Sequence, residues 1–131
     1  MEQKEIVIKR LEKLHQNLDV GMTKEKYLEV CKQLNTEPSE DKCPPSWEDF
    51  PEIVIDALNT FNQLGDRVYP EIGYIGKDYT NLNLFIELYK IEDKEFFIQL
   101  LSWLDSRAIK KSSEHLKREY DKLKRTSSGK K

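Results

Sequence analysis

Long hydrophobic runs are missing from this sequence of 131 residues. No apolar segment approaches the ~20 residues that a membrane-spanning helix needs. The N-terminal segment is charged and amphipathic, and it has neither the apolar centre nor the small-residue cleavage site of a signal peptide. We therefore expect a cytoplasmic protein without contact with a membrane.

Cysteine and histidine are scarce, with two residues of each type. In a chain without an export signal, Cys31 and Cys43 are expected to be free thiols. Together with His15 and His115 they would suffice for a zinc site. However, cysteines twelve residues apart and histidines near opposite ends of the chain do not have the spacing of such a site. We expect no metal site and no cofactor.

The sequence also lacks the common nucleophile and nucleotide motifs. It has no GxSxG elbow and no complete phosphate loop. Gly73-x-x-Gly76-Lys77 resembles part of a phosphate loop, but Asp78 stands where the loop needs serine or threonine. The same residues resemble the clamp of a KH domain, which requires a sheet that the pattern does not predict. A turn with positive-φ glycines is the simpler interpretation.

Carboxylates are abundant, but nothing in the pattern gathers them into a pocket. Asp66, Glu71 and Asp78 leave open a metal-dependent hydrolase or nuclease. Solvated faces and helix caps account for the same residues without any chemistry. We therefore expect a protein that is not an enzyme and has no catalytic residues.

Charge is divided unevenly along the chain. Residues 1–106 contain 12 basic and 21 acidic residues, a net charge of −9, whereas residues 107–131 contain 10 basic and 3 acidic residues, a net charge of +7. We expect a helical body over 1–106 and a basic C-terminal helix over 107–131 that ends in a disordered TSSGKK segment. Separated charges of this kind steer association with partners.

Apolar residues recur at helical spacing, which predicts an all-α fold of about five helices in a compact bundle. Gly21 and Gly65 fit the positions just after two of the helices, and Thr23 and Ser46 fit N-caps. Ser112 and Ser113 either cap a new helix or interrupt the last one. The helices are expected at residues 5–18, 24–34, 47–64, 81–91 and from 92 into the basic end.

Two segments are expected to be irregular. Residues 35–46 contain three prolines and small polar residues, which indicates a hinge-like linker. Residues 66–80 form a long loop rich in tyrosine and glycine, in which Val68-Tyr69 and Tyr74-Ile75 leave a small hairpin as a less favoured alternative. Long loops are often functional.

The loop over residues 66–80 has the composition of a binding surface, because tyrosine and arginine are favoured where proteins meet. The alternative is that its rings cover the core. The residues expected to bind a partner are Arg67, Tyr69, Tyr74, Lys77, Asp78 and Tyr79.

The basic C-terminal helix allows three interpretations. It binds nucleic acid through phosphates, it pairs with an acidic surface of a partner or of another copy, or it is a solvated face. Glu114, Glu119 and Asp121 dilute its charge, and Tyr120 is its only aromatic residue. The residues concerned are Lys110, Lys111, Lys117, Arg118, Lys122, Lys124 and Arg125.

A resemblance covers residues 43–108 and is strongest in a few positions. Trp47 and Pro51 before an apolar helix, and Gly76-Lys77-Asp78-Tyr79 before Leu82, resemble a pattern in small tailed-bacteriophage proteins encoded among tail-assembly genes. The resemblance extends to Ala57, Leu58 and Phe61.

These motifs are not catalytic, so the resemblance transfers no active site. It implies an accessory protein of virion assembly, most of all of the tail, or a minor virion component. Such a protein works in the host cytoplasm or within the virion and docks onto a phage structural or assembly protein or onto itself. A nucleic-acid-binding packaging or regulatory accessory is the alternative.

Overall fold

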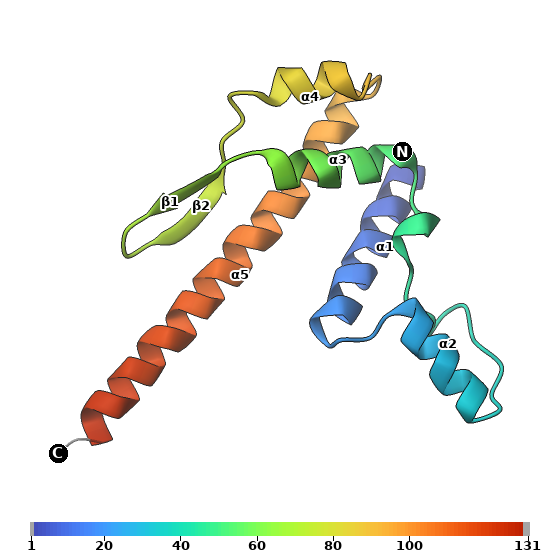
Figure 1. Ribbon diagram of the computed structural model, residues 1–131, viewed down its shortest axis with the longest axis horizontal. Coiled ribbons are helices and arrows are strands. Elements are labelled where there is room, and N and C mark those ends of the chain that lie inside the picture. Colours follow the sequence, from blue (N-terminus) through green and yellow to red (C-terminus); the bar gives the residue numbers. More distant parts are fainter. Residues whose placement is uncertain (1, 130–131) are drawn as a thin grey trace. The chain divides into compact units, whose positions relative to one another are not determined.

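The computed structural model describes residues 2–129, and contacts divide the chain into two units, residues 1–55 and 56–131 (Figure 1). Within residues 2–129 the fold is mainly helical, with five α-helices, one short 3-10 helix and a two-stranded sheet. The predicted helical character is confirmed, but the all-α prediction is wrong because of the sheet. No helix in the described part of the chain is both long and apolar enough to cross a membrane.

The first unit contains α1 (Glu2–Asp19), α2 (Lys24–Gln33) and the 3-10 helix η1 (Trp47–Asp49). Leu11 and Leu14 of α1 and Cys31 of α2 are buried. Gly21 adopts a φ of 75° between the two helices, and Thr23 caps α2 by accepting a hydrogen bond from the backbone N–H of Lys26 at 3.2 Å. Both helices therefore begin and end close to where the sequence signals predicted.

The linker over residues 35–46 contains no helix or strand, as predicted. It is nevertheless tied to the helices beside it. The backbone N–H of Ser39 donates to the Tyr27 hydroxyl at 3.1 Å, and Lys13 donates from Nζ to the Asp41 carbonyl at 2.6 Å. Pro44, within the linker, is fully buried. Both cysteines are free thiols, as expected.

The second unit is built around α5 (Lys94–Gly129), a single helix that passes through Ser112 and Ser113 without a break. Its first half also carries much of the core. It contains an apolar band of five buried residues, as the helical spacing of apolar residues predicts, namely Phe96, Phe97, Leu100, Leu101 and Leu104. The helix continues through Thr126–Gly129, where we expected a disordered end, and residues 130–131 lie outside the described residues.

Helix α3 (Glu52–Gln63) leads into this unit and α4 (Leu82–Leu88) precedes α5. Ala57 of α3 is buried, as its place in the apolar stripe predicts, and so is Thr60, whose hydroxyl donates to the Asp56 carbonyl at 2.7 Å. Lys90 ends the α4 segment with a φ of 51°. Ile91, which follows it, is buried.

Residues 66–80 are not an irregular loop, and this prediction is corrected. Strands β1 (Asp66–Tyr69) and β2 (Gly73–Lys77) form an antiparallel hairpin that lies beside α5 (Figure 1). Arg67 pairs with Gly76 and Val68 with Tyr74, so Ile75 is an extra residue in β2 and forms a bulge. Every side chain of β1 is exposed, which removes the alternating pattern that normally reveals a strand.

Candidate protein-docking surface

Asp105 of α5 fixes the hairpin to the helix. Its Oδ1 atom accepts a hydrogen bond from the Tyr74 hydroxyl at 2.5 Å, and its Oδ2 atom accepts one from the Tyr79 hydroxyl at 2.6 Å and one from the Lys77 backbone N–H at 3.1 Å. The carboxylate is 8% exposed. Sequence reasoning missed this residue, which holds the end of β2 in place.

The three hydrogen bonds also set the ionisation of the group. Burial alone would raise the pKa of Asp105, but the bonds from Tyr74, Tyr79 and the Lys77 N–H outweigh it and hold the pKa below its ordinary value. Burial and the neighbouring carboxylate raise the pKa of both tyrosines above the ordinary value. The cluster is therefore a charged acceptor with two neutral donors at neutral pH.

Lys77 is buried next to this cluster, although the sequence placed it on a binding surface. Its Nζ atom lies 2.6 Å from Asp66 Oδ1 and donates to the Leu64 carbonyl at 3.3 Å. The same atom stands 4.5 Å from the centre of the Phe61 ring. These partners make Lys77 an anchor of the hairpin rather than a free cation.

The glycines of β2 permit the strand to lie directly on α5. A Cβ atom at Gly76, whose φ is 132°, would stand 3.3 Å from Asp105 Oδ2. A Cβ atom at Gly73 would stand 3.3 Å from Ser112 Oγ and 3.7 Å from Leu116 Cδ1. The hairpin thus covers one face of α5 from Asp105 to about Leu116.

Of the other residues predicted to bind a partner, one is held by hydrogen bonds within the turn and two are exposed on β1. Asp78 accepts hydrogen bonds from the backbone N–H of Thr80 at 3.0 Å and from its hydroxyl at 2.5 Å, which closes a turn after β2 and lowers the pKa of Asp78. Arg67 and Tyr69 remain exposed on β1. Val68 and Ile72 are also exposed on the hairpin, although neither was predicted to bind a partner.

Beyond the hairpin, α5 continues as an arm, defined here as residues 113–126, in which every side chain is exposed (Figure 1). Leu116, Tyr120 and Leu123 follow one another at helical spacing and form an apolar seam on it, with exposed fractions of 40, 67 and 70%. This seam continues the face that the hairpin covers. It borders a hollow of about 700 Å³, which is lined by Glu71, Ser113, Leu116, Lys117, Glu119, Tyr120 and Leu123.

The seven basic residues from Lys110 to Arg125 are exposed, but they do not share one face. At 100° per residue, Lys110, Lys117 and Lys124 lie along one edge of the seam, and the others lie on the outer face. Lys122 forms an ion pair with Glu119 at 3.6 Å. The outer group consists of Lys111, Arg118, Lys122 and Arg125.

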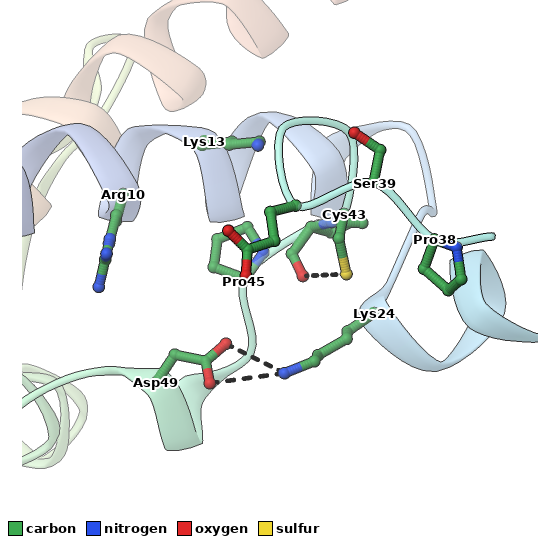
Figure 2. Close-up of a pocket in the computed structure, with 10 residues that line it drawn as sticks. Arg10, Lys13, Lys24, Pro38, Ser39, Cys43, Pro45 and Asp49 are labelled. Atoms are coloured by element: carbon green, nitrogen blue, oxygen red, sulfur yellow. Dashed lines mark hydrogen bonds and ion pairs between the residues drawn. The ribbon is translucent and has the colours of Figure 1, made fainter.

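The first unit contains a separate polar hollow of about 530 Å³ (Figure 2). Arg10, Lys13 and Lys24 line it together with Asp49, and Lys24 Nζ lies 3.4 Å from Asp49 Oδ2. A hydrogen bond from the Ser46 backbone N–H to Asp49, at 2.9 Å, further lowers the pKa of this carboxyl group. Cations and carboxylates therefore largely compensate one another in this hollow.

The candidate metal ligands do not converge. Among residues 2–129, no three histidine, cysteine, aspartate or glutamate side chains are grouped so that they could share a metal ion, and this includes Asp66, Glu71 and Asp78. His15 packs edge-on against Trp47 with ring centres 5.7 Å apart, so it is half-buried rather than a surface residue. His115 is exposed on the arm.

The second unit thus contains both a polar cluster and an exposed apolar seam. The described polar cluster around Asp105 is internally satisfied, and the seam with the hollow beside it is an exposed apolar feature. Comparison with models of protein families, with curated proteins and with solved structures found no match for this chain.

Proposed function

We propose that this protein is a non-enzymatic accessory protein that acts by docking onto another protein through the arm of α5. The resemblance in residues 43–108 supports a partner among phage structural or assembly proteins, most of all those of the tail. The accessory works in the host cytoplasm or as a minor component of the virion. The tip of the hairpin, next to the start of the arm, belongs to the same surface.

One observation carries the proposal: the arm is a helix with an apolar seam and no cover. A lone helix of about 14 residues is marginal in water, and helices usually gain their stability by burying an apolar face. The arm keeps its helix with the help of side-chain pairs such as Glu119 with Lys122. Its seam remains in solvent, and exposed apolar stripes rimmed by polar residues mark sites where proteins bind.

The experiment is co-expression of the tagged full-length protein with the products of neighbouring genes, followed by affinity purification. We expect a defined partner to co-purify with the wild type and to be lost when Leu116 and Leu123 are both replaced by serine. A matched control replaces Leu84 and Leu88 of α4, which are exposed to a similar degree, 62 and 63%. Equal losses in both variants would show that docking does not use the arm.

A second candidate function rests on the seven exposed basic residues from Lys110 to Arg125. Phosphate contacts would make binding to random DNA or RNA fall steeply with salt. Truncation before residue 107 is a poor test, since Ile109 and Ser112 lie beside the hairpin glycines. Replacing Arg118 and Arg125 by glutamine is cleaner. A salt-dependent affinity that these changes abolish would favour the nucleic-acid function over docking.

A further inference from the structure

The seam has two unlike edges, and this difference bears on what covers it. Along one edge stand Lys110, Lys117 and Lys124, one residue after the seam positions Ile109, Leu116 and Leu123 and therefore at the same seven-residue spacing. The opposite edge carries Ser112, Glu119 and Thr126, and its only charge is shared with Lys122 of the same helix at 3.6 Å. Glu114 and Asp121 lie behind the lysine edge, toward the outer face, so the charges nearest the seam on that side are positive.

A second copy of the chain fits this surface poorly in an antiparallel arrangement. Helices that pair in opposite directions bring the same edge of each helix together. Lys117 of one arm would then face Lys124 of the other. Like charges that meet across a desolvated seam cost binding energy and select against that pairing.

A parallel pair of arms meets a steric obstacle instead. Gly73 and Gly76 lie against α5 from Asp105 to Leu116, on the face that leads into the seam. In a parallel pair with a two-fold axis along the helices, both hairpins would stand between the helices directly above the seam. The two helices could then converge only over the last turns of the arm.

From these two obstacles and the lysine edge we infer that the arm receives an amphipathic helix of a different protein, with acidic residues beside its apolar stripe. This inference rests on the proposed docking function. The arm spans about 21 Å, at 1.5 Å per residue, so the contact takes about four helical turns. Acidic side chains at seven-residue spacing would each face one lysine, while leucine-like residues cover Leu116, Tyr120 and Leu123.

The test uses the full-length protein and two synthetic peptides about four turns long. Both peptides carry the same leucine stripe, flanked by glutamates in one and by lysines in the other. Fluorescence anisotropy gives their affinities at low and high salt. We expect the glutamate peptide to bind about tenfold more tightly, which corresponds to 1.4 kcal/mol, with the difference shrinking as salt is added.

Charge reversal at the edge supplies the discriminating variant. Replacing Lys117 and Lys124 by glutamate should reverse the preference between the peptides. In the control, Arg118 and Arg125 on the outer face are also replaced by glutamate. This changes the net charge by the same amount and should leave the preference between the peptides unchanged. Circular dichroism confirms that each double variant keeps its helix content.

Several results would overturn the inference. Equal binding of both peptides, or an equal effect of the edge and outer-face variants, would show that the lysine edge does not select the partner. If analytical ultracentrifugation shows a dimer, and Leu123→Ser dissociates it, then the seam is covered by a second copy of the chain and not by a different protein. If serine at Leu116 and Leu123 abolishes co-purification while the peptide preference is absent, docking stands and only the chemistry of the partner is wrong.

Discussion

At the scale of single residues, Asp105 is the most informative position in the chain. It is a buried charge on an otherwise apolar helix face, and such a charge is tolerated only when its hydrogen bonds are complete. Two hydroxyls and one N–H complete them. The cluster resembles an acid–base site in composition, but its donors and acceptors are all used within the hairpin and helix, which makes it a structural element.

The pH dependence of stability follows from this cluster. Because the folded pKa of Asp105 lies below its ordinary value of about 3.9, its stabilising effect is present above that pH and is lost as pH falls through the folded pKa. We predict that Asp105→Asn lowers the free energy of unfolding by about 2 kcal/mol at pH 7. Urea unfolding at pH 7, 5, 4 and 3 should show the two proteins converging as pH falls.

The control for this prediction is Asp121→Asn on the exposed arm, which removes the same charge and should change stability by less than about 0.5 kcal/mol. A gap between wild type and Asp105→Asn that stays constant down to pH 3 would contradict the prediction. Tyr74 and Tyr79 affect stability at high pH. Because their pKa values are raised in the folded protein, their contribution to stability is full below about pH 10 and is lost as pH rises through the pKa values of the folded state.

At the scale of elements, the hairpin shows what sequence patterns reveal and what they leave out. The band from Phe96 to Leu104 was predictable because burial imposes the helical period on it. The hairpin was predicted only as a less favoured alternative at Val68-Tyr69 and Tyr74-Ile75, since β1 is wholly exposed and four to five residues per strand are too few to show a period. Its order comes from α5, 28 residues further along at Asp105.

The site residues divide in the same way. The seam residues Leu116, Tyr120 and Leu123 are visible in the sequence as a narrow stripe with helical spacing. Their exposure depends on the tertiary structure and cannot be read from that spacing. Lys77 looked like a surface cation, and only its contacts with Asp66 and Phe61 show otherwise. The one sequence signal for Asp105 is its place on the apolar face, four residues after Leu101 and four before Ile109.

A comparison of Gly76 with Gly65 gives the second prediction. Gly76 has a φ of 132° and faces Asp105 at close range, whereas a Cβ atom at Gly65 would meet nothing within 4 Å. We predict that Gly76→Ala lowers the free energy of unfolding by about 1–3 kcal/mol through backbone strain and displacement of the carboxylate. Gly65→Ala should change it by less than about 0.5 kcal/mol. Similar unfolding midpoints for the two variants would contradict the close approach of β2 to α5.

At the scale of the whole molecule, the residues that stabilise the core and those proposed for docking lie in different stretches of the same helix. The first half of α5 is buried and holds the second unit together, and the arm is exposed and contributes little to the core. Charge follows a similar division, since residues 1–106 have a net charge of −9 and residues 107–131 one of +7. Opposite charges on one chain favour ordered approach to a partner by steering its orientation.

This division makes a prediction that separates docking from folding. Replacing Leu116 and Leu123 by serine should lower the free energy of unfolding by only about 1 kcal/mol, because Leu123 is 70% exposed and Leu116, at the edge of the hairpin, is 40% exposed. Leu100→Ala, at a fully buried position of the same helix, should cost about 2–5 kcal/mol through the cavity it creates. Chemical denaturation of the three proteins measures this directly. A large loss in the serine variant would mean that the seam is covered by the protein itself or by a second copy in solution, and the arm would then no longer be a free docking surface.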